Sequence, residues 1–577
     1  MKRTPQRGWV SVAILIGMTA GPGQAWGEVF SRHVVVAQEG HASDVGRDVL
    51  RAGGNAVDAA VATALALAVT LPEAGNLGGG GFLVAYLASS REVVTVDFRE
   101  LAPALARPRM YLDREGKLRP RHRAGAWAAG VPGTVRGLGL AQQRWGRLRW
   151  EDVVRPAVRL AREGFVISAD LAASLNDQLA PRVSTKFDSP DARLADFPSS
   201  VAVFSRPDGA PWKAGDRFLQ PDLAATLQRI AQEGPKEFYQ GRTAELIVRS
   251  MECNDGLIGP DDLANYEAKC RPPVQTTFRG YEVFGMGPPS SGGVVVCQML
   301  KILERYDLKA DGRDTPRTLH RVTEAMRRGF FTRATLLADP DFVGIPVAEL
   351  VSKEHADQLA QTIGEQATPS RVLAPFPIVG AESDHTTHLS TLDEAGNAVA
   401  LTYTLEESYG SKLVVEGAGF LLNNEMGDFN LIPGLTDAEG RIGTEPNQIA
   451  PGKRMLSSQS PTVVLHQGRV CVVTGSPGGR TIPNTTLWIL LNLLEFGLEP
   501  PAAIAAGRTH HQWFPDVLLV ERGAFPTTTL TALEALGHRW RTIERQGNAN
   551  TIVVETKTGR LHGVPDPRRP TTKASGD

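Results

Sequence analysis

Two patterns of apolar residues divide the chain. Residues 42–71 repeat with a helical period that breaks at Gly53–Gly54, which predicts two helices. The second helix, AVDAAVATALALAV, is apolar nearly all round and is therefore expected to be buried. Residues 150–250 also have a mainly helical pattern. From about residue 386 the pattern changes to short alternating runs, THLSTL, AVALTYTL, PTVVLH and RVCVVTG, which predict strands.

Shorter signals predict the remaining elements. A glycine turn and a strand are expected over 75–87 (GNLGGGGFLVAYL), and 92–100 (EVVTVDFRE) alternates as the partner strand. Further elements are expected as a strand near 281–286, a turn over 287–293, helices at about 294–306 and 484–496, and strands near 517–522 and 551–556. Residues 565–577 are polar and rich in proline, so they are expected to be loose. This order of helices and strands predicts a layered α+β protein.

Composition excludes several classes of protein. The 577 residues are 42% hydrophobic and 22% charged, which is typical of soluble globular chains and excludes wholesale disorder. With 62 basic and 63 acidic residues, no overall field favours nucleic acid as a partner. The four cysteines cannot form a disulfide scaffold. Cys297 and Cys471 lie in apolar runs and are expected to be buried thiols, whereas pairing of Cys253 with Cys270 stays open.

The N-terminus has the features of a secretory signal peptide. A basic segment (KRTPQR) precedes an apolar run (WVSVAILIGMTA) and then small residues, so residues 1–27 are expected to be a removed leader. Cleavage after Ala25 and cleavage after Gly27 both satisfy the small-residue rule. The location that follows is secreted or periplasmic. A short membrane anchor is the alternative, although the run is shorter than the roughly 20 residues that a spanning helix needs.

Several motifs with known chemistry are missing or incomplete. Gly78–Gly81 is neither a dinucleotide fingerprint nor a P-loop, and the chain has no GxSxG nucleophile elbow. His385 and His388 lack the glutamate of a HExxH zinc site, and the adjacent His510 and His511 cannot easily converge on one metal. Neither a metal nor a cofactor is therefore expected.

Residues 386–407 predict a hairpin that brings hydroxyl groups together. The two alternating runs flank Glu394-Ala395-Gly396, an order that suits a three-residue loop with glycine in the left-handed position. Asp393 then faces Asn397, and the same register places Thr386 opposite Thr404. Glu406 follows two residues further on the same face. The alternative is that the two threonines lie on a solvated strand face.

The chain resembles the gamma-glutamyltranspeptidases (glutathione hydrolases), a family of N-terminal-nucleophile enzymes, from about residue 33 to about 568. The blocks that carry the resemblance occur in the family's order: GGNAVDAAVA (53–62), GGGGF (78–82), DFRELAP (97–103), FYQG (238–241), PPSSGG (288–293), TTHLS (386–390), NNEMGDF (423–429), PGKRMLSSQSPT (451–462), TGSPGG (474–479), HHQWFPD (510–516) and DPR (566–568).

The resemblance implies a precursor that cuts itself between His385 and Thr386. The fragments, 28–385 and 386–577, would form a heterodimer around one shared core, a four-layer αββα sandwich. Position 387 is also threonine, and only the family motif selects Thr386. A threonine hydroxyl needs a base, and the α-amine that cleavage frees, with a reference pKa of about 8, would supply one.

The resemblance also implies the roles of individual residues. Thr404 supports the nucleophile, and the backbone N–H groups of Gly478 and Gly479 form the oxyanion hole. Arg99 binds the α-carboxylate of the glutamyl group together with the hydroxyls of Ser457 and Ser458. Glu406, Glu425 and Asp428 hold the α-ammonium. Taken alone, the glycines would be a plain turn and the acids solvated charges.

The implied activity is hydrolysis of glutathione and other γ-glutamyl compounds, or transfer of the glutamyl group to amino-acid or dipeptide acceptors. The chain departs from many relatives at Glu406, where asparagine is common. It also has Glu439 in the lid loop (433–451), where some members have a covering tyrosine. Two alternatives stay open: the related cephalosporin (glutaryl) acylases, and a secreted binding protein that has lost turnover.

Overall fold

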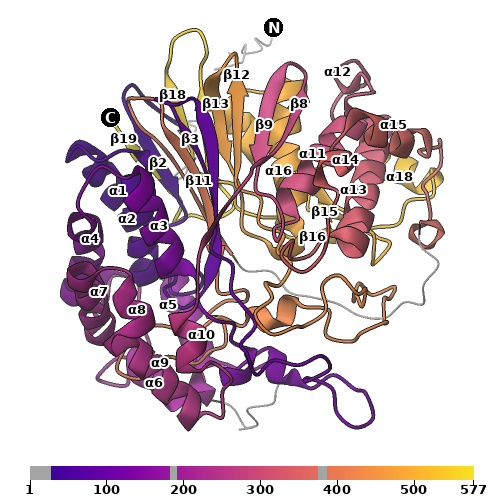
Figure 1. Ribbon diagram of the computed structural model, residues 1–577. Helices are drawn as coiled ribbons and strands as arrows, with labels where there is room; N and C mark the ends of the chain where they lie inside the picture. The colour runs from indigo at the N-terminus through magenta and orange to yellow at the C-terminus, as the bar shows by residue number, and fades with distance from the viewer. Residues whose placement is uncertain (1–26, 182–190, 374–385) are drawn as a thin grey trace, which may run out of the picture.

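Two sheets lie face to face between two layers of helices in the computed structural model, which describes residues 27–181, 191–373 and 386–577 (Figure 1). The first sheet has the strand order β19-β2-β10-β11-β3-β4-β7 and the second β1-β18-β17-β13-β12-β9-β8. Neighbouring strands in both sheets pair antiparallel. The predicted four-layer αββα sandwich is thus confirmed.

The strands of the first sheet are β2 (Val34–Ala37), β3 (Gly80–Leu87), β4 (Glu92–Asp97), β7 (Lys269–Arg271), β10 (Thr387–Leu392), β11 (Ala398–Thr404) and β19 (Lys573–Gly576). Those of the second are β1 (Glu28–Phe30), β8 (Val274–Phe278), β9 (Tyr281–Gly285), β12 (Thr462–His466), β13 (Arg469–Thr474), β17 (Thr551–Val554) and β18 (Leu561–Val564). Two small sheets contain β5 (Phe165–Val166) with β6 (Arg217–Phe218), and β14 (Thr509–His510) with β15 (Leu518–Glu521) and β16 (Trp540–Ile543).

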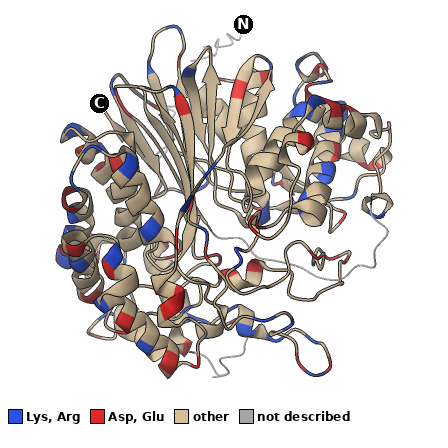
Figure 2. Ribbon diagram, in the orientation of Figure 1, with Lys and Arg blue, Asp and Glu red and all other residues tan. Residues whose placement is uncertain are grey.

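Each sheet carries its own helical layer. The helices on the side of the first sheet are α1 (Gly40–Arg51), α2 (Ala56–Thr70), α3 (Thr134–Trp145), α4 (Trp150–Glu163), α5 (Ala169–Leu179), α6 (Pro198–Phe204), α7 (Pro221–Glu233), α8 (Lys236–Gln240), α9 (Arg242–Cys253) and α10 (Pro260–Ala264). Those on the side of the second are α11 (Gly292–Leu303), α12 (Leu308–Asp311), α13 (Pro316–Leu336), α14 (Val347–Leu350), α15 (Lys353–Gln361), α16 (Ile482–Leu490), α17 (Pro500–Ala505) and α18 (Thr527–Ala535). Figure 2 shows that the charged residues gather on these helices and the loops, whereas the strands carry few.

Successive side chains along a strand pack into different layers of the sandwich. On β2, Val34 and Val36 pack between the two sheets, whereas Val35 and Ala37 pack against the helical layer. Both faces of the sheet are thereby buried, so these strands consist of apolar residues rather than of apolar and polar residues in turn.

The predicted helices and strands are confirmed in the first 100 residues and in the hairpin region. The break at Gly53–Gly54 separates α1 from α2, and every residue of α2 is buried. The runs THLSTL, AVALTYTL, PTVVLH and RVCVVTG form β10, β11, β12 and β13. The helix expected at 484–496 begins at Ile482 and ends in a π-helical turn, Leu491–Glu495.

The prediction of a loose C-terminus is wrong. Residues Lys573–Gly576 form β19, which pairs with β2, and the carbonyl oxygen of Asp577 accepts hydrogen bonds from the backbone of Ser31 and Arg32, each 2.8 Å long. Polar composition did not reveal this strand because backbone groups, rather than apolar side chains, make the ladder.

The two predicted fragments contribute to the same sheets. In the first sheet, β10 and β11 lie between β2 and β3, so strands from after residue 386 are flanked by strands from before residue 385. This interleaving agrees with the expectation of one shared core. The predicted leader, apart from Gly27, lies outside the described ranges. So does His385, and with it the predicted cleavage site.

Two of the four cysteines are buried and two are exposed. Cys297 and Cys471 are buried as expected, and burial raises the pKa of each thiol to about 12. Cys253 and Cys270 are exposed and form no disulfide.

Over the described ranges, every helix is too short or too polar to cross a membrane.

Candidate active site

The hairpin of β10 and β11 has the predicted register. Thr387 pairs with Tyr403, and the pairing continues to Leu392 opposite Ala398. Gly396 adopts the left-handed conformation with φ 87°, which allows the tight three-residue loop. Thr386 directly precedes β10, and Thr404 is the last residue of β11. The hairpin therefore brings these two hydroxyls to the same end of the sheet, as predicted.

The two threonines line one narrow cavity of about 30 Å³ with most of the other predicted site residues. The solvated-face alternative is excluded because Thr386 is 7% exposed and Thr404 2%. The residues around this cavity, called the first cavity below, are Arg99, Arg333, Thr386, Thr404, Glu406, Glu425, Asp428, Ser457, Ser458, Gln459, Gly479, Arg480 and Ile482.

The glycine-rich turn before β3 positions Thr404. Asn76 Nδ2 donates to the carbonyl oxygen of Thr404 over 2.9 Å, and Asn76 Oδ1 accepts from the backbone N–H of Gly79. A Cβ atom at Gly79 would lie 2.0 Å from that same carbonyl oxygen, which no side chain tolerates. The glycines thus allow close packing against β11, in line with the weak case for phosphate binding. Asn76 was not predicted.

Arg99 is the centre of a buried charge cluster. Its Nη1 lies 2.9 Å from Glu425 Oε1 and 3.5 Å from Glu100 Oε2, and its Nη2 pairs with Asp428. Its Nε donates to the Met455 carbonyl over 3.2 Å. Burial alone would lower the pKa of Arg99, but the three carboxylates outweigh it and the pKa lies above its ordinary value.

Two carboxyl groups of this cluster, those of Glu425 and Glu100, are harder to ionise than in water. Burial raises the pKa of Glu425 well above its ordinary value, and Arg99 offsets this only in part. Burial likewise raises the pKa of Glu100 to about 8. A positive group that binds beside these two acids would favour their ionised forms, because an opposite charge nearby lowers the pKa of a carboxyl group. Glu100 was not predicted as a member of the site.

The turn that carries Glu425 and Asp428 is held by two asparagines. This 3-10 turn spans Glu425–Asp428. Asn423 Oδ1 accepts from the backbone N–H of Glu425 over 3.1 Å, and its Nδ2 donates to the carbonyls of Gly78 and Gly130. Asn424 Oδ1 accepts from the backbone N–H of Glu407. The motif NNEMGDF therefore supplies both the acids and the groups that position them.

Glu406 has a strained backbone beside the nucleophile. Its φ is 79°, an uncommon value for a residue with a side chain, and its N–H donates to Thr404 Oγ1 over 2.9 Å. Lys412 stabilises the loop that follows, because its Nζ donates to the carbonyls of Ser408 and Gly410. Burial lowers the pKa of Lys412 to about 8. Glu406 lines the first cavity.

Ser457 and Ser458 each receive a hydrogen bond from a group that can only donate. The backbone N–H of Gln459 donates to Ser457 Oγ, and Arg333 Nε donates to Ser458 Oγ, each over 3.1 Å. Both hydroxyls therefore keep their own hydrogen available for an acceptor. Arg333 lies on α13, more than 120 residues from Ser458 in sequence, and no local pattern pointed to it.

Gly478 and Gly479 lie where two cavities meet. Gly478 has φ 129° and Gly479 has φ 50°, both in the region that favours glycine. Gly479 lines the first cavity, whereas Gly478 lines a second cavity of about 350 Å³, and Thr386 lines both. The turn is closed by Thr481, whose hydroxyl donates to the Gly478 carbonyl over 2.7 Å.

His388 and His510 have structural roles. His388 is buried with Nδ1 2.8 Å from Thr402 Oγ1 and Nε2 3.1 Å from Ser390 Oγ, and burial lowers its pKa to about 3. His510 contacts Asn484 and Gln512 in the same way. In the part of the chain that the structure describes, no group of three or more potential ligands is placed to hold a metal.

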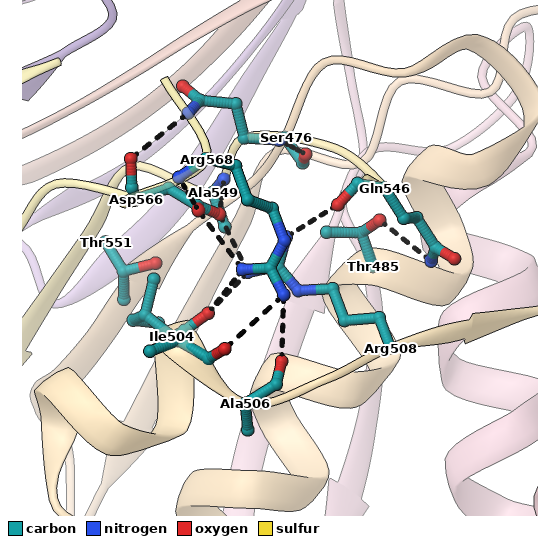
Figure 3. A network of polar contacts seen from close by, with 12 residues as sticks. Ser476, Thr485, Ile504, Ala506, Arg508, Gln546, Ala549, Thr551, Asp566 and Arg568 are labelled. Atoms are coloured by element: carbon teal, nitrogen blue, oxygen red, sulfur yellow. Dashed lines mark hydrogen bonds and ion pairs between the residues drawn. The ribbon is translucent and has the colours of Figure 1, made fainter. Parts of the chain in front are cut away.

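A buried ion-pair network, part of which is drawn in Figure 3, includes Arg568, which lines the second cavity. Arg508 Nη2 lies 2.7 Å from Asp566 Oδ2. Arg568 pairs with both Asp566 and Glu521. Burial alone would raise the pKa of Asp566, but Arg508 and Arg568 outweigh it and the pKa lies below its ordinary value. The DPR motif thus has a structural role, since it fixes the segment that precedes β17.

Similarity to known proteins extends over nearly the whole chain. Residues 42–576 match the gamma-glutamyltranspeptidase family. The chain is 42% identical over 537 residues to a glutathione hydrolase proenzyme of Escherichia coli K12, covering 93% of this chain and 90% of that one. It is 35% identical over 541 residues to the acylase ACY 1 proenzyme of Pseudomonas sp. strain SE83, covering 92% of each. The crystal structure of a cephalosporin acylase from Bacillus halodurans has a TM-score of 0.84 at 25% identity, covering 98% of this chain and 99% of that one. The chain therefore belongs to the gamma-glutamyltranspeptidase family.

Proposed function

We propose that the protein is a self-processing γ-glutamyl hydrolase and transpeptidase that uses Thr386 as its nucleophile. The observation that carries this proposal is the first cavity, where Thr386 and Thr404 lie beside Arg99 and three carboxylates, Glu406, Glu425 and Asp428. A γ-glutamyl head group is a zwitterion, so its site needs charges of both signs close to the nucleophile.

Maturation is the first acyl transfer in this mechanism. The Thr386 hydroxyl attacks the carbonyl of His385, the peptide bond shifts to an ester, and water hydrolyses the ester. The products are residues 28–385 and 386–577, with a new α-amine on Thr386. That amine, with a reference pKa of about 8, then accepts the hydroxyl proton during turnover.

The charge cluster explains how a zwitterion would bind. Arg99 contacts Glu425 and Asp428 directly. A glutamyl head inserted between them gives its α-carboxylate to Arg99 and its α-ammonium to the acids, so each charge keeps a partner. The hydroxyls of Ser457 and Ser458 complete the carboxylate site, because both have a hydrogen to donate. The ammonium favours ionised Glu425, whose pKa burial has raised.

Turnover follows from this placement. The Thr386 hydroxyl attacks the γ-carbonyl, and the N–H groups of Gly478 and Gly479 stabilise the oxyanion. The leaving amine takes a proton, and water or an acceptor amine then resolves the acyl-enzyme. Glutathione and other γ-glutamyl compounds are the proposed donors, and amino acids or dipeptides the proposed acceptors. No step needs a metal or a cofactor.

The acylase alternative is less well supported. A glutaryl group lacks the ammonium, so an acylase site has no use for three carboxylates near the nucleophile. Hydrolysis of γ-glutamyl p-nitroanilide and of glutaryl p-nitroanilide tests the difference. The γ-glutamyl compound should have the higher kcat/KM, and a preference for the glutaryl compound would favour the acylase. Glutamate binding without any product release would favour the binding protein instead.

Two further proposals concern the precursor. Intact mass measurement of the purified protein should give fragments of about 38 and 21 kDa, in proportion to 62.1 kDa for 577 residues. A single chain would contradict self-processing. The basic and apolar residues at the start of the chain support export, and hence a secreted or periplasmic location. Removal of residues 2–27 should leave the protein inside the cell.

A further inference from the structure

We infer that the second cavity is the subsite for the leaving group and the acceptor, and that it selects amino acids and peptides with additional carboxylate groups. This inference rests on the proposed function. It names the chemical class of the acceptor, which the family resemblance left open.

The position of the cavity follows from the residues that it shares with the first. Thr386 lines both cavities, and the two glycines of the oxyanion turn divide between them, Gly479 on the side of Arg99 and Gly478 on the other side. A carbonyl at Thr386 that points its oxygen to this turn must have its two substituents on opposite sides. With the glutamyl group in the first cavity, the group bonded through nitrogen lies in the second.

The second cavity has an excess of positive charge. Its charged lining residues are Glu73, Arg541, Arg545, Arg568 and Arg569. Arg569 pairs with Glu73, and Arg568 pairs with Glu521 and Asp566. Arg541 and Arg545 form no ion pair within the described ranges, and both are exposed. Two positive charges therefore face this cavity without a protein counterion.

The wall that carries these arginines is fixed rather than loose. Arg508 donates to the Gln546 carbonyl over 2.8 Å, and Arg568 donates to the carbonyls of Ile504 and Ala506 (Figure 3). Arg545 Nη1 in turn donates to the Arg568 carbonyl over 3.0 Å. Since the buried network holds the segment from Arg545 to Asn548, little ordering is required when an anion binds.

The chemistry fits an acceptor with carboxylates. The neutral acceptor amine uses its lone pair to form the new C–N bond at the acyl carbon, and the C–O bond to Thr386 breaks. The electron pair returns to the Thr386 oxygen, and the amine proton passes to that oxygen through the Thr386 α-amine. The carboxylates take no part in these steps, so they are free to contact Arg541 and Arg545.

Transfer from γ-glutamyl p-nitroanilide to the dipeptides Gly-Glu and Gly-Gln tests the inference, because these acceptors differ only in one carboxylate. The kcat/KM ratio of Gly-Glu to Gly-Gln should be about five to ten at low salt, in keeping with two exposed ion pairs, and should fall as salt is added. In the double variant Arg541→Gln/Arg545→Gln the ratio should fall to about one. Arg159→Gln, an exposed arginine on α4, is the control and should keep the wild-type ratio.

The outcomes separate the two proposals. A wild-type ratio of one or less, or a ratio unchanged in the double variant, would overturn the anionic subsite while the proposed function stands. If the enzyme releases no p-nitroaniline even without an acceptor, both proposals are overturned.

Discussion

The Nη1 atom of Arg99 lies 2.9 Å from Oε1 of Glu425, so a predicted carboxylate-binding residue contacts a predicted ammonium-binding residue. Asp428 contacts the same guanidinium group through Nη2. The two halves of the predicted head-group site are thus one cluster whose charges already offset each other. Substrate recognition in such a cluster exchanges protein partners for substrate partners, and it does not require burial of new uncompensated charge.

Replacement of Arg99 should mainly weaken substrate binding. The guanidinium contacts a part of the substrate remote from the reacting bond, so its effect is expected in KM more than in kcat. We expect Arg99→Ala to raise the KM for γ-glutamyl p-nitroanilide by about 10- to 100-fold, the loss of one charged hydrogen-bonding group. Arg99→Lys keeps the charge and should recover part of this loss. A normal KM in both variants would remove Arg99 from the site.

Thr386→Ala should abolish both self-cleavage and turnover, because one hydroxyl performs both reactions. The matched control is Thr387→Ala, because Thr387 is the adjacent threonine and lines neither cavity. Thr387 is the first residue of β10, and no hydrogen-bond partner is within reach of its hydroxyl in the described residues. We expect the control to split and to retain activity. Mass spectrometry decides the outcome, and a Thr386→Ala protein that still splits at this bond would refute the assignment.

Asp428→Asn should narrow the preference for γ-glutamyl over glutaryl substrates. The variant removes a carboxylate that we expect to contact the ammonium, and the glutaryl group has no ammonium to lose. The ratio of the γ-glutamyl to the glutaryl kcat/KM should therefore fall by about 10- to 100-fold, because the γ-glutamyl value falls and the glutaryl value does not. Asp170→Asn, on the exposed face of α5, is the control. An equal loss for both substrates would indicate a structural role for Asp428.

Glu100→Gln should change how stability depends on pH. Burial raises the pKa of Glu100 to about 8 in the folded protein, above its unfolded value of about 4.3. Between these values the folded state holds a proton that the unfolded state has lost, so the wild-type free energy of unfolding falls as pH rises through this range. The variant lacks this loss. Its advantage should grow from about 1 kcal/mol at pH 5 to on the order of 5 kcal/mol at pH 8.5, because each pH unit between the two pKa values costs the wild type about 1.4 kcal/mol.

Urea unfolding at several pH values measures this effect. The exposed Glu416→Gln is the control, and it should differ from the wild type by a small constant amount across the range. If the difference between Glu100→Gln and the wild type does not grow with pH, Glu100 is ionised in the folded protein and the charge balance around Arg99 is not as described.

Elements whose structure depends on residues close together in the chain could be predicted from the sequence. The hairpin loop needs glycine at position 396, and once the loop is fixed the alternation of both strands sets the register that brings Thr386 to Thr404. The buried helix α2 was equally clear, because apolar residues cover all its faces.

Residues that act across long separations could not be found in this way. Asn76 holds the carbonyl of Thr404 from 328 positions away, and Arg333 orients Ser458 from 125 positions away. Nothing in a local pattern marks an asparagine or an arginine as part of such a contact. Glu100 was not predicted for a different reason: burial in the folded protein raises its pKa, and its neighbours in sequence do not indicate this burial. The C-terminal strand was missed because its pairing depends on the backbone.

That strand gives the last prediction. Deletion of residues 573–577 removes β19, and with it the ladder to β2, the buried side chain of Ala574 and the ion pair between Lys573 and Asp44. At about 0.5–1.5 kcal/mol for each lost hydrogen bond, the deletion should lower the free energy of unfolding by about 2–4 kcal/mol. The Tm should fall by about 4–16 °C, since 1 kcal/mol corresponds to about 2–4 °C in a large domain. Asp577→Asn is the control: it keeps the strand and weakens only the side-chain contacts with Arg51 and His33, so its Tm should stay within about 2 °C of the wild type. An unchanged Tm in the deletion variant would mean that residues 573–577 are as loose as their composition suggested, and that β2 is stable as an edge strand.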